Sequence, residues 1–320
     1  MVSKIEIDLK SLKFWFSIMV VINISLIVYI ISNSWERDRS DNYALIDPQT
    51  ASMEVNNFLR GQQYLTVSYT PLKTEVEKIT NSSKGHYGIY FEDLITGAWF
   101  GINERDMFVP ASLLKTPAVI AIVKKLEDGY LSMETKLTIS EADIEPNLTF
   151  GSLASKGYGY DIDVKSALNF VINESDNTAY NVLVRQLTYG DLAEAYIAMG
   201  LPPPSFSPDI SSTAITPKNY MNILRALYYS AYLRRTFSNF ILSLLSDTKF
   251  DYGIISGLPD NIKVAHKIGD WGPTKSYHDC GIIYAPNKPY MLCIMSSGTT
   301  KKDFSETASN VSRTIYNYLK

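Results

Sequence analysis

The chain has 320 residues, and its 30 Lys and Arg against 33 Asp and Glu give a formal net charge of −3. Its 46% hydrophobic and 20% charged residues exclude a disordered or collagen-like chain, and its near-neutral charge argues against a domain that binds nucleic acid. The two cysteines and three histidines lack the number and spacing of a disulfide scaffold or a metal motif, so we expect no metal and no cofactor.

An uncharged apolar segment lies near the N-terminus, at residues 14–32 (FWFSIMVVINISLIVYIIS). A helix of this length covers about 28 Å, which is close to the hydrocarbon thickness of a bilayer. Three lysines precede the segment and two arginines follow it, which biases the N-terminal end toward the cytoplasm. We therefore predict a cytoplasmic N-terminus at residues 1–13, a single-pass transmembrane anchor at 14–32, and an extracytoplasmic remainder attached to the cell membrane.

Two other interpretations of residues 14–32 stay open. The segment is compatible with a cleaved secretory signal, although no small-x-small cleavage site follows Ser32 directly. It is also compatible with a buried helix of a globular core. The transmembrane anchor and the secretory signal would each put the rest of the chain outside the cytoplasm.

The next part of the chain predicts a tether followed by a domain that begins with strands. Residues 33–80 have mixed polarity and indicate a tether that ends in a first helix near Pro71, where a proline is tolerated. Residues 86–94 alternate between polar and apolar side chains and, together with 98–102, predict a hairpin. Residues 112–245 then have a mostly helical pattern, interrupted by glycine and proline clusters.

The C-terminal part returns to strands. Three strands are expected at residues 263–270, 278–285 and 290–296, because turn residues separate them. A last amphipathic helix has apolar residues three or four apart, namely Phe304, Ala308, Val311, Ile315 and Leu319. Strands at both ends with helices between them predict an α/β (α+β) domain at residues 81–320, with an antiparallel sheet flanked by helices and an all-helical subdomain.

The first chemical motif is S-x-x-K at Ser112 and Lys115, at an expected helix start. Residues three apart lie on one face of a helix, so Lys115 can reach the Ser112 hydroxyl. The apolar residues 117–126 that follow indicate a buried helix, and burial disfavours the charged form of Lys115, which could then act as a base. The same spacing recurs at Ser246 and Lys249 in a polar break, so the spacing alone is a weak signal.

Two further motifs strengthen the first. Ser175-Asp176-Asn177 lies in a break between two helical stretches, and Lys267-Ile268-Gly269 lies on the first C-terminal strand. The order S-x-x-K, S-D-N, K-x-G resembles that of class A β-lactamase-like serine hydrolases and penicillin-binding proteins. The resemblance extends from about Gly85 to the end of the chain, and it implies a β-lactamase/transpeptidase-like fold.

The resemblance also implies catalytic roles. Ser112 would be the nucleophile that forms an acyl-enzyme, and Lys115 would be its activating base. The hydroxyl of Ser175 would relay a proton to the leaving nitrogen, helped by the positive charge of Lys267.

Other residues of the motifs would bind the substrate. The resemblance implies that the Asn177 side chain holds the substrate amide and that the backbone N–H groups of Ser112 and Asp270 form an oxyanion hole. Gly269 would let the backbone approach the substrate closely. Asp176 is expected to brace its loop by local hydrogen bonds.

The chain departs from the family pattern in two places. Residues 201–216 contain no glutamate to activate a deacylating water, and Asp209 is their only acid, with either a catalytic or a local structural role. Ile268 stands where the family usually has Thr or Ser, whose hydroxyl would help to bind a substrate carboxylate. Both departures predict slow deacylation and weaken the expectation of efficient antibiotic hydrolysis.

We therefore expect a membrane-anchored serine hydrolase that acts on β-lactam or peptidoglycan-peptide substrates through Ser112, with no nucleic-acid or metal partner. The alternative is a penicillin-binding or sensor ectodomain without turnover. Among the remaining residues, Cys280 and Cys293 are expected on neighbouring strands, where they could face each other, and buried thiols are the favoured state. His266 and His278 are expected to have structural roles.

Overall fold

The computed structural model describes most of the chain, namely residues 19–20, 22–25, 45–46, 68–144, 150–204 and 214–320. The chain divides into two compact units, residues 1–44 and residues 45–320, and the described residues of the first are helical. Among the described residues, no helix has both the length and the apolar character that crossing a bilayer requires. The predicted anchor at residues 14–32 lies largely outside the described residues.

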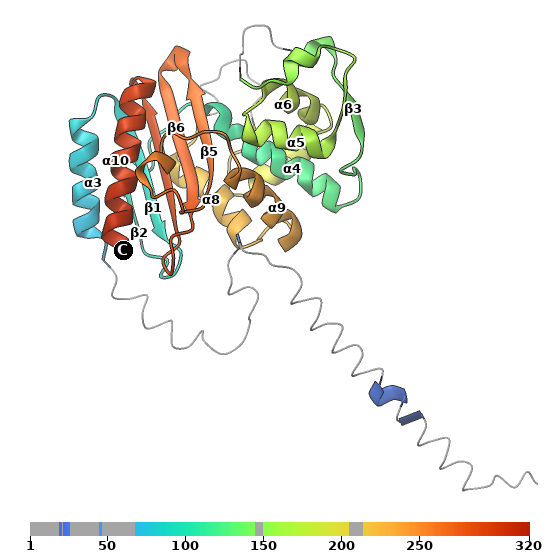
Figure 1. The fold of residues 1–320 in the computed structure, drawn as a ribbon, viewed down its shortest axis with the longest axis horizontal. Helices are drawn as coiled ribbons and strands as arrows, with labels where there is room; N and C mark the ends of the chain where they lie inside the picture. The colour runs from blue at the N-terminus through green and yellow to red at the C-terminus, as the bar shows by residue number, and fades with distance from the viewer. Residues whose placement is uncertain (1–18, 21, 26–44, 47–67, 145–149, 205–213) are drawn as a thin grey trace, which may run out of the picture. The chain divides into compact units, whose positions relative to one another are not determined.

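The second unit contains a five-stranded antiparallel sheet in the order β2-β1-β7-β6-β5 (Figure 1). Its strands are β1 (His86–Asp93), β2 (Trp99–Ile102), β5 (Val264–Trp271), β6 (Ser276–Ile283) and β7 (Tyr290–Ser297). The predicted hairpin and the three C-terminal strands are confirmed. The strand that carries the K-x-G motif, β5, therefore forms one edge of the sheet.

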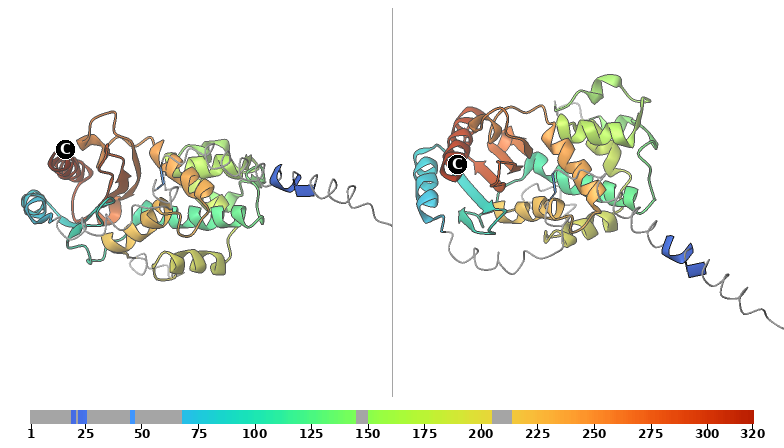
Figure 2. Two further views of the ribbon diagram at one scale, coloured as in Figure 1. Left: turned by 90° about the horizontal axis from the view of Figure 1, so that it is seen from below. Right: turned by 60° about the horizontal axis from the view of Figure 1, so that its bottom comes forward.

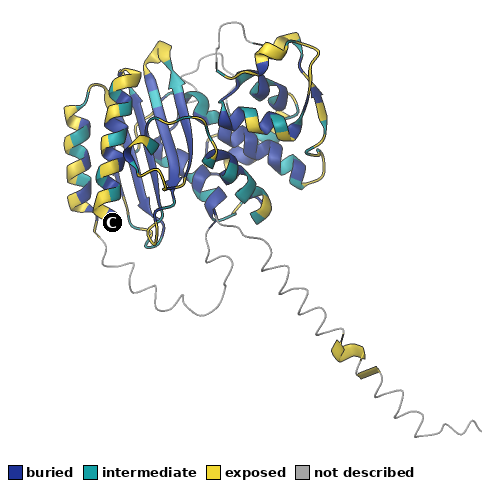
Figure 3. Ribbon diagram, viewed as in Figure 1, coloured by how far each residue is buried: buried dark blue, intermediate teal, exposed yellow. Residues whose placement is uncertain are grey.

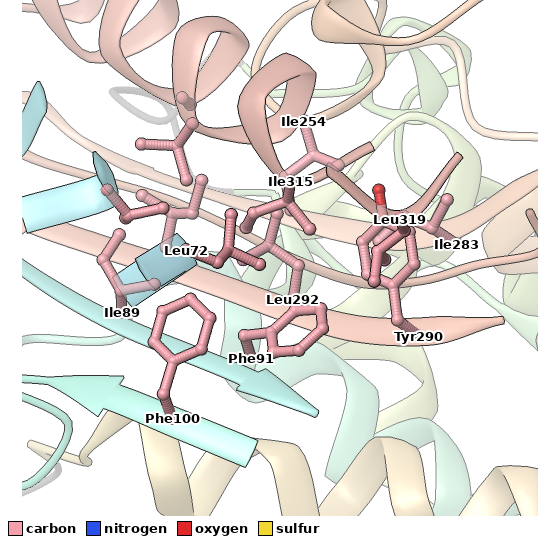
Figure 4. Close-up of a cluster of buried hydrophobic side chains, with 14 of the residues drawn as sticks. Leu72, Ile89, Phe91, Phe100, Ile254, Ile283, Tyr290, Leu292, Ile315 and Leu319 are labelled. Carbon is pink, nitrogen blue, oxygen red and sulfur yellow. The ribbon is translucent and has the colours of Figure 1, made fainter. Parts of the chain in front are cut away.

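Two helices, α3 (Thr70–Ser82) and α10 (Lys301–Leu319), pack on one face of this sheet. The predicted apolar stripe of α10 is buried and joins β-strand side chains in a single hydrophobic cluster. Figure 4 shows Ile315 and Leu319 of this stripe among Leu292, Tyr290 and Ile283 of the sheet. Burial of this large apolar area is the main force that holds the two helices on the sheet.

The remaining helices form the all-helical part and the other cover of the sheet (Figures 1 and 2). They are α4 (Lys115–Glu127), α5 (Val164–Asn173), α6 (Asn177–Val184), α7 (Tyr189–Ala198), α8 (Pro217–Tyr228) and α9 (Arg235–Ser246). A small two-stranded sheet joins β3 (Lys136–Thr138) to β4 (Asp161–Asp163). The predicted combination of an antiparallel sheet with an all-helical subdomain is confirmed.

Helix α4 is buried along most of its length (Figure 3). Ten of its 13 residues are buried, as the apolar sequence after Lys115 predicted. Because α4 begins at Lys115, Pro117 lies in the first turn, where backbone N–H groups have no partner within the helix and a proline costs no hydrogen bond.

The prediction of two buried thiols is wrong. Cys280 on β6 and Cys293 on β7 are direct cross-strand partners, and their Sγ atoms form a disulfide. Both residues are fully buried, so packing brings the two side chains into contact between paired strands. The sequence placed the residues on neighbouring strands but did not give their register, which decides whether they face each other.

Removal of this disulfide should destabilise the domain. The bond closes a loop with a sequence separation of 13 residues, and loops of this size contribute about 3 kcal/mol. The Cys280→Ala, Cys293→Ala double variant should therefore unfold at a lower urea concentration than the oxidised wild-type protein. Thiol titration of the unreduced, denatured wild type gives the check: two reactive thiols would contradict the disulfide.

Candidate active site

The residue expected to be the nucleophile lies on a short 3-10 turn, Ala111–Leu114, directly before α4. Ser112 is partly exposed, whereas Lys115, the first residue of α4, is buried. Ala111 has a φ of +50°, in the left-handed region that residues with a Cβ rarely adopt. Such strain persists only where the surrounding structure imposes it, and it is often found at functional sites.

The turn is held against the edge strand β5. A Cβ atom on Gly269 would lie 2.8 Å from the Pro110 carbonyl oxygen and 2.8 Å from Cδ2 of His278. Only glycine therefore allows β5 to come this close to the residues before Ser112. The sequence assigned the close approach at Gly269 to a substrate, and the structure shows a close approach to the Pro110 backbone.

His278 fixes the same segment from the neighbouring strand. Its Nε2 atom is 2.7 Å from the Val109 carbonyl oxygen, and its Nδ1 atom accepts a hydrogen bond from the Ser296 backbone N–H at 3.1 Å. These partners require a neutral ring with the proton on Nε2. Burial lowers the pKa of His278 to about 4, so the ring stays neutral at physiological pH. His278 thus has the structural role that was predicted.

His266 is equally buried and lies 2.8 Å, through Nδ1, from Oδ1 of Asp279. The second carboxylate oxygen of Asp279 accepts a hydrogen bond from the Ile254 backbone N–H at 2.8 Å. The pair therefore links β5 and β6 to the segment that follows α9, which is again a structural role.

Two lysines from different parts of the fold converge on Ser175. Lys115 Nζ donates to the Ser175 carbonyl oxygen, lies 3.3 Å from Ser175 Oγ, and donates to Asn177 Oδ1 at 2.6 Å. Lys267 Nζ donates to Ser175 Oγ at 2.9 Å and to the Ile268 carbonyl oxygen at 3.2 Å. The three motifs that lie far apart in the sequence therefore meet at one hydroxyl group.

The electrostatics of this cluster favour loss of a proton from Lys267. Burial lowers the pKa of Lys267 well below its usual value, and the nearby charge of Lys115 lowers it further, against the opposing effect of Asp279. The resemblance implied that a full charge on Lys267 assists Ser175. In the structure the amine is almost completely buried, which makes that charge costly.

The loop that carries Ser175 is strained and braced. Ser175 is 1% exposed and has a φ of +54°, again in the left-handed region. The Asp176 carboxylate accepts hydrogen bonds from the backbone N–H groups of Ala179 and Leu153, both at 2.8 Å. Asp176 thereby caps the N-terminus of α6 and has the bracing role that was predicted.

Sequence reasoning missed two contributions to this region. The Phe250 ring centroid lies 5.7 Å from Lys267 Nζ, so an aromatic face covers one side of the amine. Lys249, the lysine of the second S-x-x-K, forms an ion pair with Glu174, the residue before Ser175. No local pattern signals either contact, because each joins residues that are far apart in the chain.

The remaining predicted residues are at the edge of the cluster or outside the described chain. Asp270 follows Gly269 on β5, and its carboxylate forms an ion pair with Lys301 at 3.2 Å. Ile268 is 1% exposed and offers no hydroxyl group. Asp209 lies outside the described residues.

The convergence of the three motifs agrees with the family that comparison with known proteins indicates. The model of the "Beta-lactamase enzyme family" matches residues 71–319, which is most of the chain and includes every residue of the cluster. The chain belongs to the β-lactamase enzyme family. It is therefore a serine hydrolase of the group that contains β-lactamases and penicillin-binding relatives.

Individual relatives are distant. β-Lactamase VEB-1 of Pseudomonas aeruginosa is 22% identical over 294 residues, covering 80% of this chain and 94% of the relative. The structure of PBP-A has a TM-score of 0.71 at 22% identity and covers 78% of this chain and 96% of its own. The structure of a β-lactamase from Chitinophaga pinensis has a TM-score of 0.72 at 19% identity and covers 78% of this chain and 100% of its own. At these identities the structural likeness shows the fold of this β-lactamase-family chain.

Proposed function

We propose that this chain forms an acyl-enzyme through Ser112 on β-lactam or peptidoglycan-peptide amides, and that the acyl-enzyme breaks down slowly. The observation that carries the proposal is the convergence of Lys115 and Lys267 on the Ser175 hydroxyl, with Lys115 directly after the turn that contains the partly exposed Ser112. A nucleophile, two buried amines and a relay hydroxyl are the groups that acyl transfer from an amide requires.

In this proposal the Lys115 ammonium first releases a proton to solvent, and Ser112 Oγ then attacks the amide carbonyl and transfers its own proton to the neutral Lys115 amine. The backbone N–H groups of Ser112 and Asp270 stabilise the negative charge that develops on the carbonyl oxygen. Ser175 donates its proton to the leaving nitrogen as the C–N bond breaks, and it regains a proton from Lys115 or Lys267, which both contact its hydroxyl. The product is an ester between Ser112 and the acyl part of the substrate.

Slow deacylation is proposed from the sequence of residues 201–216, which contain no glutamate to activate a water molecule. A variant of the fold relative PBP-A has been solved as an acyl-enzyme complex with penicillin G, at 22% identity to this chain. By analogy we propose that penicillin acylates this chain too. A penicillin-binding sensor without turnover is the second candidate, favoured by the absence of both that glutamate and a hydroxyl at position 268.

We also propose that the domain lies outside the cytoplasm, attached to the membrane by residues 14–32. The uncharged sequence of that segment supports an anchor. The disulfide between Cys280 and Cys293 supports an oxidising compartment independently of the anchor, because structural disulfides are rare in the reducing cytosol.

Intact mass spectrometry after incubation with penicillin G tests the acyl-enzyme. The wild-type protein should gain the mass of one penicillin, and the adduct should persist after excess drug is removed. Ser112→Ala should gain no mass, because the attacking oxygen is absent. The matched control is Ser246→Ala in the second S-x-x-K, which should label like the wild type; labelling of Ser112→Ala would refute the assigned nucleophile.

Turnover separates the two candidates. A chromogenic cephalosporin should give one stoichiometric burst followed by a slow steady rate if deacylation limits the reaction. A burst with no further product favours the sensor. Rapid multiple turnover would contradict slow deacylation and would require a deacylating base elsewhere in the chain.

A further inference from the structure

Ser175 occupies a conformation that its own backbone disfavours. Its φ of +54° is left-handed, and its carbonyl and hydroxyl oxygens both receive hydrogen bonds from Lys115. A residue with a Cβ stays in this region only when its neighbours are held in place. Asp176 supplies one restraint on the C-terminal side, through its bonds to two backbone N–H groups. The restraint on the N-terminal side comes from Glu174.

The Glu174 carboxylate binds two partners from different segments. One oxygen forms the ion pair with Lys249, and the other accepts a hydrogen bond from Ser152 Oγ at 2.6 Å. Burial by itself would raise the pKa of Glu174, but the hydrogen bonds from Lys249 and Ser152 outweigh it, and the pKa is lowered. Glu174 is therefore ionised at neutral pH, and its side chain is only 16% exposed.

Lys249 is attached to the same loop through its backbone. Its N–H donates to the Asn173 carbonyl oxygen at 3.2 Å, two residues before Ser175. The next residue, Phe250, places its ring 5.7 Å from Lys267 Nζ. The segment after α9 thus contacts Lys267 and the two residues that precede Ser175.

We propose that Glu174 and Lys249 are positioning residues for acyl transfer. Their ion pair holds the loop so that Ser175 Oγ stays within hydrogen-bond distance of Lys115 and Lys267 at the same time. This inference rests on the proposed function, and it gives the second S-x-x-K lysine a role that is distinct from that of Lys115. The Lys249 side chain is 69% exposed, so the ion pair contributes little to overall stability. Its main effect is on the position of the loop that carries Ser175.

The test is a double-mutant cycle on acylation by penicillin G. We expect Glu174→Gln and Lys249→Met each to lower the maximal acylation rate constant by about five- to tenfold, with little change in the drug concentration that gives half of that rate. The double variant should lose no more than either single variant, because one interaction is removed in all three. Lys249→Arg keeps the positive charge and should restore most of the rate.

The matched control is the ion pair between Glu75 and Lys78 on α3, which is exposed and far from the motif residues in sequence. Lys78→Met should leave the rate unchanged. Urea unfolding should give the same midpoint for all these variants. A rate loss that follows a lowered midpoint, or a double-variant loss equal to the product of the single losses, would overturn the positioning role.

A measurement without substrate keeps this inference separate from the proposed function. Amide hydrogen exchange at Ser175 and its neighbours should become faster in Glu174→Gln and Lys249→Met than in the wild type, because the restraint on the loop is lost. Unchanged exchange in both variants would overturn the inference even if penicillin labels the protein. Failure of penicillin to label the wild type, with faster exchange in the variants, would overturn the proposed function alone.

Discussion

Replacement of Lys115 by methionine should lower the rate of acylation by penicillin G about a thousandfold, within the range that general acid–base groups contribute. Lys115 is buried and its Nζ contacts the Ser175 hydroxyl and Asn177 Oδ1, so its loss removes both the proposed base for Ser112 and one restraint on the relay. Methionine has a similar length and shape but cannot accept a proton.

Stopped-flow or quenched labelling with a fluorescent penicillin measures this effect. Lys124→Met is the matched control on the same helix, because Lys124 pairs with Glu127 and Asp128 away from the motifs. The control should acylate at the wild-type rate, and both variants should have native circular dichroism. A Lys115→Met protein that acylates at the rate of the control would show that Ser112 is activated by another group.

Lys267→Met should have opposite effects on activity and stability. Acylation should fall about a hundredfold, as for loss of one preorganised donor, because Ser175 Oγ loses its hydrogen bond from Lys267 Nζ. The folded state should become more stable by about 1–3 kcal/mol, since a well-packed apolar side chain replaces an amine whose charge is costly to bury.

The pH dependence has a definite sign. The folded pKa of Lys267 is lowered, so the unfolded chain binds more protons between that pKa and the unfolded value of about 10.4. In this window the wild-type free energy of unfolding receives a contribution that rises with pH, which the methionine variant lacks. The stability advantage of Lys267→Met should therefore be largest at low pH and shrink as pH approaches 10.

Urea unfolding of both proteins at several pH values measures the difference. The advantage at neutral pH and its decline toward pH 10 are the expected results. A variant that is less stable than the wild type at neutral pH would mean that the amine contributes more through its hydrogen bonds than its burial costs.

The sequence predicted the fold well because its strongest signals are local. Alternating residues gave the hairpin of β1 and β2, and the stripe that includes Phe304 and Ile315 gave α10. The apolar stretch after Lys115 gave the buried helix α4. Each of these patterns reflects one face of one element, which is what a window of the sequence contains.

The sequence predicted the members of the candidate site, whose catalytic roles stay predictions, but it did not predict all of their contacts. Motif order brought Ser112, Lys115, Ser175 and Lys267 together, and the structure places both lysines at the Ser175 hydroxyl. The pair of Glu174 and Lys249 depends on the approach of two segments 75 residues apart, for which the sequence has no periodic signal.

The cysteines illustrate the same limit. Neighbouring strands were predicted, but a shift of one residue in register would have turned one thiol to the opposite face of the sheet. The observed register makes Cys280 the partner of Cys293 on one side and of Lys267 on the other. Pairing of this kind is set by the whole sheet and its turns, so it lay beyond the reach of local patterns.

The position of β5 at the margin of the sheet has a consequence for how the enzyme would lose activity. Among the described strands, β5 is hydrogen-bonded to β6 alone, and the disulfide joins β6 to β7 without involving β5. Fraying of a marginal strand requires less free energy than melting of the whole domain. Local unfolding of β5 would then abolish catalysis by displacing Lys267 and Gly269, while the rest of the molecule keeps its native circular dichroism spectrum.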